Sequence, residues 1–212
     1  MTFVIGTSIY WAQANDGKAV AIVIKSLGDT KAKQKAGWAV VAKGSKLFSG
    51  DEMQTKKDGY AAVMFLDDKS VVKVKPNSVL KIQGTYEGKT ISKQLVMDVG
   101  ELFVKVSKQK GSFQVATPTS VASVKGTEFW TMVGADGATV IIGLEGIIEL
   151  VNKATGQTVT VNPGQTGTSN KDGATVGTTV EGSIPDAGAL KEEIRVKFKD
   201  ANGVEKEVLI QY

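Results

Sequence analysis

Two pairs of acidic residues are the clearest candidates for chemistry in this sequence. Asp67 and Asp68 stand together beside Ser70, where carboxylate and hydroxyl oxygens could face a cation. Calcium and magnesium sites need more oxygen ligands at defined spacing, and none follows here. We therefore interpret Asp67–Ser70 as a turn and predict no metal site.

Glu145 and Glu149 could form the carboxylate pair of a glycoside hydrolase. They stand at strand spacing on either side of Gly146, and the sequence identifies no general-acid partner.

Gly126-Thr127 lacks the glycine-rich run that opens a helix in a phosphate loop, so it predicts a turn with Thr127 bonded to the backbone.

Three tryptophans could form a carbohydrate platform, but their positions argue against it. Trp130 stands in a core-like strand, Trp11 in a segment we expect to be removed, and Trp38 is alone.

The composition excludes several classes of enzyme. The chain has no histidine and no cysteine, which rules out Cys/His zinc sites, thiol catalysis, Ser-His-Asp triads and disulfides. We predict no catalytic residue, no cofactor and no enzymatic activity.

The net charge of +4 is unevenly distributed. Residues 15–112 carry a net +8, residues 113–182 carry −3 and residues 183–212 carry −1. Almost every basic residue is lysine, whereas proteins that read nucleic acid rely on arginine. Lysines that alternate with valine, as in Val72–Lys75, are typical of the solvated face of a strand, so we predict no nucleic-acid partner.

The most apolar stretch, Phe113–Val151, has no helical period and predicts the centre of the fold. It divides into four strands, Phe113–Ala116, Lys125–Val133, Thr139–Leu144 and Gly146–Val151. Both faces of 127–133 are apolar, which indicates burial on both faces.

Short strand candidates recur every ten or so residues with glycine turns between them, and 15–166 contains no convincing helix. Asn162-Pro163-Gly164-Gln165 fits a type II turn, in which glycine accepts the positive φ. The pattern predicts an all-β fold, a single sandwich or roll of many short strands.

The ends of the chain differ from this body. Residues 1–14 are apolar and finish with Ala12-Gln13-Ala14, which predicts a signal peptide. No basic region precedes it, so we expect the signal to be truncated; a short buried or exchanged strand is the alternative. No stretch reaches the ~20 apolar residues that a membrane span requires.

Residues 167–189 are rich in Gly, Thr and Ser and predict a flexible linker or arm. In residues 190–212, two alternating runs flank Asn202-Gly203, which predicts a C-terminal β-hairpin.

The body carries a series of motifs that resembles the FecR domain from about Ala19 to Gln165. The most specific element is Thr117-Pro118 followed by Val124-Lys125-Gly126-Thr127-Glu128-Phe129. The signature positions, interpreted as structural, are Gly50, Asp51, Asp58, Gly59, Asp67, Pro76, Gly100, Thr117, Pro118, Gly126, Thr127, Phe129, Gly146 and Gly164.

The resemblance implies a bacterial, extracytoplasmic β-domain without enzymatic activity, located in the periplasm, at the cell surface or secreted. The founding members relay receptor occupancy to a sigma factor and carry an anti-sigma segment and a membrane helix before the domain. The sequence has neither, so it is similar to the stand-alone secreted members.

We therefore expect a protein-interaction or scaffold module whose partner is itself or an envelope protein. Strand addition could join copies into a homo-oligomer or filament. The candidate interface residues belong to the first strand and the C-terminal hairpin: Ile22, Ile24, Ile194, Val196, Phe198, Val208 and Ile210. The alternative is a periplasmic signalling partner in FecR-type regulation of iron uptake through a sigma factor.

Overall fold

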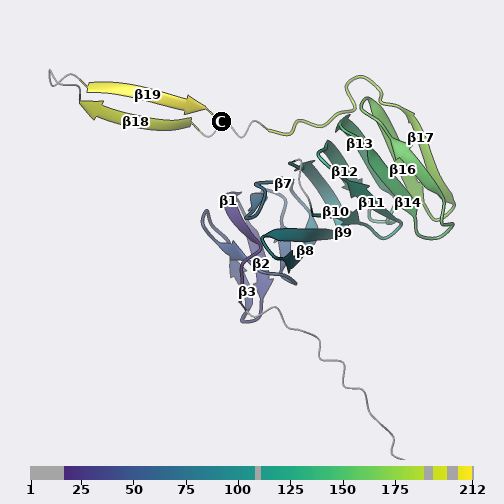
Figure 1. Cartoon of the computed structure of the whole chain (residues 1–212), viewed down its shortest axis with the longest axis horizontal. Helices are drawn as coiled ribbons and strands as arrows, with labels where there is room; N and C mark the ends of the chain where they lie inside the picture. Colours follow the sequence, from purple (N-terminus) through teal and green to yellow (C-terminus); the bar gives the residue numbers. More distant parts are fainter. Residues whose placement is uncertain (1–16, 108–110, 189–192, 200–204, 212) are drawn as a thin grey trace, which may run out of the picture.

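A computed structural model describes residues 17–107, 111–188, 193–199 and 205–211. The predicted signal peptide and the turn of the C-terminal hairpin lie outside these ranges. The described chain is all-β, as predicted. All of its strands up to Thr178 form two layers that share one long strand, and the last two strands form a separate sheet (Figure 1).

In the first layer, sheet A, all neighbouring strands are antiparallel. Its order is β4 (Lys46–Leu47), β1 (Ala21–Leu27), β6 (Tyr60–Phe65), β7 (Val71–Val74), the second half of β9 (Thr90–Lys105), β12 (Glu128–Val133), β13 (Thr139–Glu145), β16 (Gln165–Asn170) and β17 (Gly173–Thr178).

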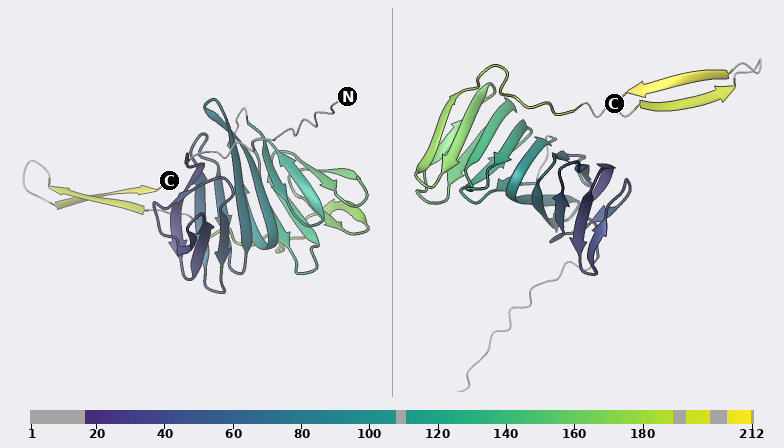
Figure 2. Two further views of the ribbon diagram at one scale, coloured as in Figure 1. Left: turned by 90° about the horizontal axis from the view of Figure 1, so that it is seen from below. Right: turned by 180° about the vertical axis from the view of Figure 1, so that it is seen from behind.

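The second layer, sheet B, has the order β3 (Gly37–Val40), β2 (Thr30–Gln34), β5 (Glu52–Thr55), β8 (Val79–Glu87), the first half of β9, β10 (Phe113–Ala116), β11 (Ser120–Val124), β14 (Ile148–Asn152) and β15 (Thr158–Val161). Only β9 and β10 are parallel among the described pairs. The chain alternates between the layers, so β2 and β3 lie at one end of the body and β16 and β17 at the other (Figures 1 and 2).

Strand β9 crosses from one layer to the other at Gly100. Val99 pairs with Val79 in sheet B, while Gly100 pairs with Val133 in sheet A. Gly100 has φ +111°, and a Cβ there would lie 2.2 Å from the Oγ of Ser78. Only glycine combines this backbone conformation with so close a neighbour.

One apolar core fills the space between the layers. Phe65 and Phe113 meet edge to face at 5.8 Å between ring centroids. The predicted central segment supplies Phe129, Ile141 and Ile148, all fully buried. It contains one strand more than predicted, β11, whose small Ser and Ala residues conceal its apolar period.

The predicted linker is the main difference from the sequence analysis. Residues 167–178 continue sheet A as β16 and β17 instead of leaving the body. The small residues have a packing role, because a Cβ on Gly167 would lie 2.6 Å from a methyl group of Val161. The arm proper is therefore residues 179–188.

Candidate protein-interaction surfaces

The Asp67-Asp68 pair is occupied by a lysine of the same chain. Lys93 Nζ lies 2.7 Å from Asp67 Oδ2 and 3.0 Å from Asp68 Oδ2, and also donates to the carbonyl of Ile91. All three charged side chains are buried.

Main-chain N–H groups and the Ser70 hydroxyl add further hydrogen bonds to this ion cluster, while Asp67 Oδ1 is buried and accepts from no described group. Asp67 Oδ2 accepts the N–H of Ile91, and both carboxylate oxygens of Asp68 accept from Ser70. The carboxylates are thereby committed to tying the β6–β7 turn to β9. Within the described residues, no group of three or more Asp, Glu, His or Cys side chains is placed to hold a metal.

Glu145 and Glu149 do not form a joint site. Glu145 ends β13 in sheet A, Glu149 stands in β14 of sheet B, and both are exposed. Glu145 is instead in register with Glu128 of β12.

The FecR-like positions lie mostly at turns and close contacts. Gly50, Gly100, Gly126, Gly146 and Gly164 all have positive φ. A Cβ on Gly59 would lie 2.5 Å from the carbonyl oxygen of Asp29, and one on Gly146 would lie 2.7 Å from that of Gly126. At the predicted type II turn, Gln165 N–H donates to the Asn162 carbonyl.

The remaining signature side chains have different surroundings. Asp51 Oδ2 accepts hydrogen bonds from the main-chain N–H of Phe48 and from the side-chain amide of Gln34. Asp58 Oδ1 accepts a hydrogen bond from the main-chain N–H of Asp29. Pro76 follows Lys75 in the turn between β7 and β8.

Thr117 shows how the most specific motif is held. Its hydroxyl bonds to Ser120 and accepts from Thr139, while Pro118 packs beside Gly137. Thr127 differs from the prediction: its hydroxyl is buried and bonds to no described partner, because the side chain packs beside Gly146.

The outer face of sheet A carries a second apolar cluster, which we call the outer cluster. Phe103, Trp130 and Ile142 are at most 7% exposed, and Met132, Val140 and Leu144 surround them. The arm (residues 179–188) covers this face through Ala187. The prediction that β12 is buried on both faces is therefore confirmed: Phe129 faces the core and Trp130 the arm.

Lys73 in β7 and Lys75, which follows β7, bind the arm through hydrogen bonds. Lys73 Nζ donates to the carbonyls of Ala187 and Gly188, and Lys75 Nζ donates to that of Asp186. Lys73 is only 8% exposed, so the expectation of a solvated lysine face is wrong there. Burial and the neighbouring charge of Lys75 lower the pKa of Lys73.

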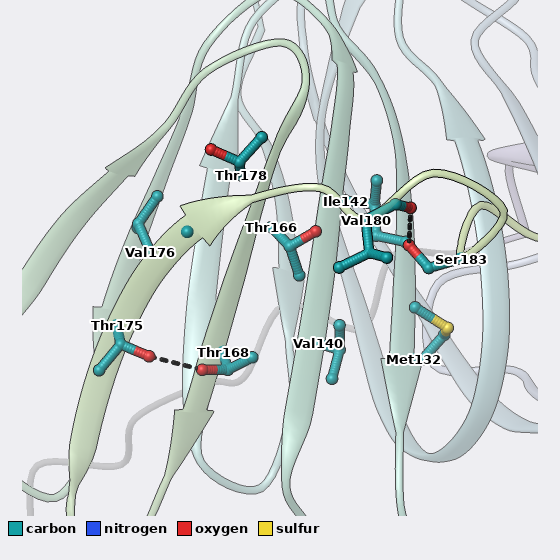
Figure 3. A pocket seen from close by; sticks show the side chains of 11 residues that line it. Met132, Val140, Ile142, Thr166, Thr168, Thr175, Val176, Thr178, Val180 and Ser183 are labelled. Carbon is teal, nitrogen blue, oxygen red and sulfur yellow. Dashed lines mark hydrogen bonds between the residues drawn. The ribbon is translucent and has the colours of Figure 1, made fainter.

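The arm leaves an open groove of about 450 Å³ near the β17 edge (Figure 3). Met132 and Val140 line one wall, and Thr168 and Thr175, bonded to each other, line another. The arm bends over the groove at Val180–Ser183, where Ser183 donates to the Val180 carbonyl.

The other end of the body has an exposed apolar strand at its margin. Strand β3 is the last strand of sheet B and pairs only with β2 among the described strands. Trp38 is 46% exposed and Val40 is 72% exposed. In the sequence, Trp38 stands out only as an isolated aromatic residue, although it alternates with Val40.

Strands β18 (Glu193–Lys199) and β19 (Glu205–Gln211) form the predicted C-terminal hairpin as a two-stranded sheet of their own. Ile194 is in register with Ile210, and Val196 with Val208. The side chains of Ile194, Val196, Phe198, Val208 and Ile210 lie outside the part of the structure that is described.

The first predicted interface segment is differently placed. Ile22 and Ile24 are half-buried in β1, which pairs along its length with β6 and, at its start, with β4. Its main-chain groups are thus used within sheet A, and β1 is not the unpaired strand that strand addition requires.

Comparison with known proteins agrees with the motifs. The family model described as FecR protein matches residues 51–149, so this part of the chain is similar to FecR domains. The matched range is shorter than the range from about Ala19 to Gln165 over which the motifs resemble the family, and it contains neither β3 nor the C-terminal hairpin. No curated protein matches the chain.

Two crystal structures of a candidate anti-sigma factor from Parabacteroides distasonis have a similar fold. They are 19% and 20% identical to this chain, with TM-scores of 0.51 and 0.50. Each match covers 60% of this chain and 59% of the other, so the likeness spans well under two thirds of that protein. At 19% and 20% sequence identity, the structural likeness establishes only that the folds are similar.

None of the described residues belongs to a helix that is long and apolar enough to cross a membrane.

Proposed function

We propose that this protein is a non-enzymatic, extracytoplasmic FecR-type interaction module that joins copies of itself through its C-terminal hairpin. FecR domains are generally extracytoplasmic, which supports the compartment. The observation that carries the proposal is that β18 and β19 form a two-stranded sheet of their own, which pairs with no described strand of the body.

A two-stranded hairpin is marginally stable in water unless it packs on something else. In its sequence, apolar residues alternate with charged ones, and Ile194 is in register with Ile210 and Val196 with Val208. Both of its strands also have an edge that pairs with no described strand, and such edges add readily to another sheet. Docking on a neighbour would satisfy the apolar face and one edge together.

Addition of the hairpin of one copy to the body of the next is a head-to-tail contact. When the rotation between copies does not close a ring, such contacts generate an open polymer. The proposal therefore includes extracellular filaments as the assembled form.

The test compares the chain from Asn15 with a variant that lacks Leu190–Tyr212, using light scattering coupled to size exclusion and electron microscopy. We expect oligomers or fibres for the longer chain and a folded monomer for the shorter one. Val196→Asp should act like the deletion because it disrupts the apolar face, whereas Lys197→Gln on the opposite face should not. Unchanged oligomeric state and thermal stability after deletion would contradict the proposal.

The alternative is a periplasmic signalling partner in FecR-type regulation, and it draws support from the description of the similar structures as a candidate anti-sigma factor. It predicts a monomer at every concentration and altered sigma-factor-dependent transcription in a strain without the protein. Unchanged transcription in that strain would exclude it.

A further inference from the structure

The buried ion cluster brings an amine into contact with two carboxyl groups away from solvent. The side chains of Lys93, Asp67 and Asp68 are 0%, 3% and 9% exposed. Lys93 Nζ lies 5.4 Å from the ring centroid of Phe65, and Phe113 packs edge to face against that ring. An amine and a carboxyl group can condense to an amide, so the cluster holds the components of a covalent bond as well as those of an ion pair.

The geometry around Asp67 fits attack by the lysine nitrogen. Lys93 Nζ lies 2.7 Å from Asp67 Oδ2, which is bonded directly to the carboxyl carbon Cγ. Oδ2 also accepts the main-chain N–H of Ile91 at 2.8 Å. This N–H is placed to stabilise negative charge on Oδ2 when a nitrogen adds to Cγ, as the donors of an oxyanion hole do. The other oxygen, Oδ1, is buried and accepts from no described group, so its departure breaks no described hydrogen bond.

Asp68 is placed to carry protons between the reacting groups. Its Oδ2 lies 3.0 Å from Lys93 Nζ. The N–H and the hydroxyl of Ser70 donate to its two oxygens at 2.8 Å and 2.9 Å, which fixes the orientation of the carboxylate. A carboxylate held within hydrogen-bond reach of an ammonium group meets the geometric requirement for a general base.

Burial and proximity both favour condensation. In water, solvation stabilises a separated ammonium and carboxylate, and the excess of water opposes loss of a further water molecule. Removal of charged groups from water takes this stabilisation away. Groups that a fold holds in reacting geometry also behave as if present at an effective concentration on the order of 10⁵–10⁸ M.

We propose that Lys93 and Asp67 become joined by an isopeptide bond once the chain has folded. Asp68 accepts a proton from the Lys93 ammonium, and the neutral nitrogen adds to Cγ of Asp67. The bond between Cγ and Oδ1 then breaks, and Oδ1 leaves as water with two protons that come from Nζ. Asp68 returns to its carboxylate form. The balance is one ammonium and one carboxylate converted to one amide and one water, without any oxidant or co-reactant.

The bond would join the two layers of the body. Lys93 belongs to the first half of β9, which pairs within sheet B, whereas Asp67 follows β6 of sheet A. A covalent link between distant residues stabilises a fold by restricting the unfolded chain, as a disulfide does. The chain has no cysteine, so it cannot form a disulfide of its own. This proposal goes beyond the proposed function and does not depend on self-association.

The test is the mass of the purified, denatured chain, followed by sequencing of its tryptic peptides. We expect the wild type to weigh one water molecule less than its sequence requires and to yield a branched peptide that joins the Asp67 side chain to Lys93. Lys93→Arg keeps a positive charge but has no amine that forms this bond, so it should show the full mass. Lys81→Arg, on an exposed position of β8, should lose water as the wild type does.

Asp68→Asn tests the proton carrier, because the amide keeps the shape of the side chain but is a poor base. General acid–base catalysis contributes about 10²–10⁴-fold, so the freshly purified variant should have the full mass and lose water only slowly. Loss of water as fast as in the wild type overturns this role of Asp68.

Two results would overturn the isopeptide bond itself. One is a wild-type chain that has the full mass although circular dichroism shows folded β-structure. The other is a loss of water that maps to an Asp-Gly pair, such as Asp58-Gly59, and persists in Lys93→Arg, because cyclisation of aspartate to succinimide also releases water.

Discussion

At the scale of single residues, Lys93 shows what burial does to a charged group. The lysine and its two aspartates are removed from water, and their mutual contacts compensate for the lost solvation. The sequence indicated the acidic turn, but nothing in the alternation of β9 marked Lys93 as its partner.

Replacing this lysine should be costly. Lys93→Met leaves two carboxylates buried without their counter-ion, so we expect the free energy of unfolding to fall by about 3–5 kcal/mol in urea titrations. Lys81→Met, on an exposed position of β8, should change it by less than about 0.5 kcal/mol. Equal effects of the two substitutions would contradict the structural role of the cluster.

Tyr60 provides a pH-dependent test of burial. Burial raises its pKa to about 12 from the usual 10.0. The folded chain therefore holds the phenolic proton more tightly than the unfolded chain, and this contribution to stability is complete below pH 10.0 and lost as the pH rises through about 12.

We expect the phenolate absorbance of the wild type to include a step at about 12 that is missing in Tyr60→Phe. The variant should also lose less stability than the wild type as the pH rises above 10.0. A Tyr60 step at the ordinary value would show that the ring is solvated.

At the scale of elements, β9 joins the two layers, and its course depends on one glycine. Gly100→Ala would force a Cβ against Ser78 at positive φ. The backbone strain alone costs about 1–3 kcal/mol, and the clash adds to it. Gly177→Ala, where nothing lies within 4 Å, should change the thermal midpoint little. Similar midpoints for both variants would contradict the role of Gly100 as the crossing point.

The arm is the second element whose role can be isolated. Truncation after Gly188 keeps the contacts of Lys73 and Lys75 with the arm, while truncation after Thr179 removes them. In a chain from Asn15 with Trp38→Phe, Trp130 is the single tryptophan. We expect acrylamide to quench its fluorescence strongly only in the shorter variant. Equal quenching would mean that the arm does not shield the outer cluster.

At the scale of the whole molecule, charge is segregated along the chain, and the proposed assembly uses this segregation. If contacts between the basic residues 15–112 and the acidic residues 113–182 of neighbouring copies stabilise the proposed assembly, raising the salt concentration above physiological values should weaken it, because salt shortens the Debye length below its value of about 8 Å at 0.15 M.

The sequence alone determined the fold class, most turns and the FecR resemblance, because period-two alternation and glycine at positive φ are local properties of the chain. It also predicted the C-terminal hairpin, since Asn-Gly between two alternating runs is a strong local signal. It did not give the register, because a two-residue turn at Asn202-Gly203 would place Lys199 opposite Lys206, whereas Lys199 is opposite Glu205. Strands β16 and β17 were missed because Gly, Ser and Thr carry no apolar period, and they fold as strands only where neighbouring side chains fill the space above them.

Only the tertiary structure decided which charged residues are buried, which face the arm covers and which strands end the sheets. Lys73 and Lys93 have the same sequence surroundings as exposed lysines, and their burial depends on segments 114 and 26 residues away in the chain. Edge position is likewise a property of strand order, which non-local hydrogen bonding sets, so no local pattern could have shown that Trp38 and Val40 border the sheet.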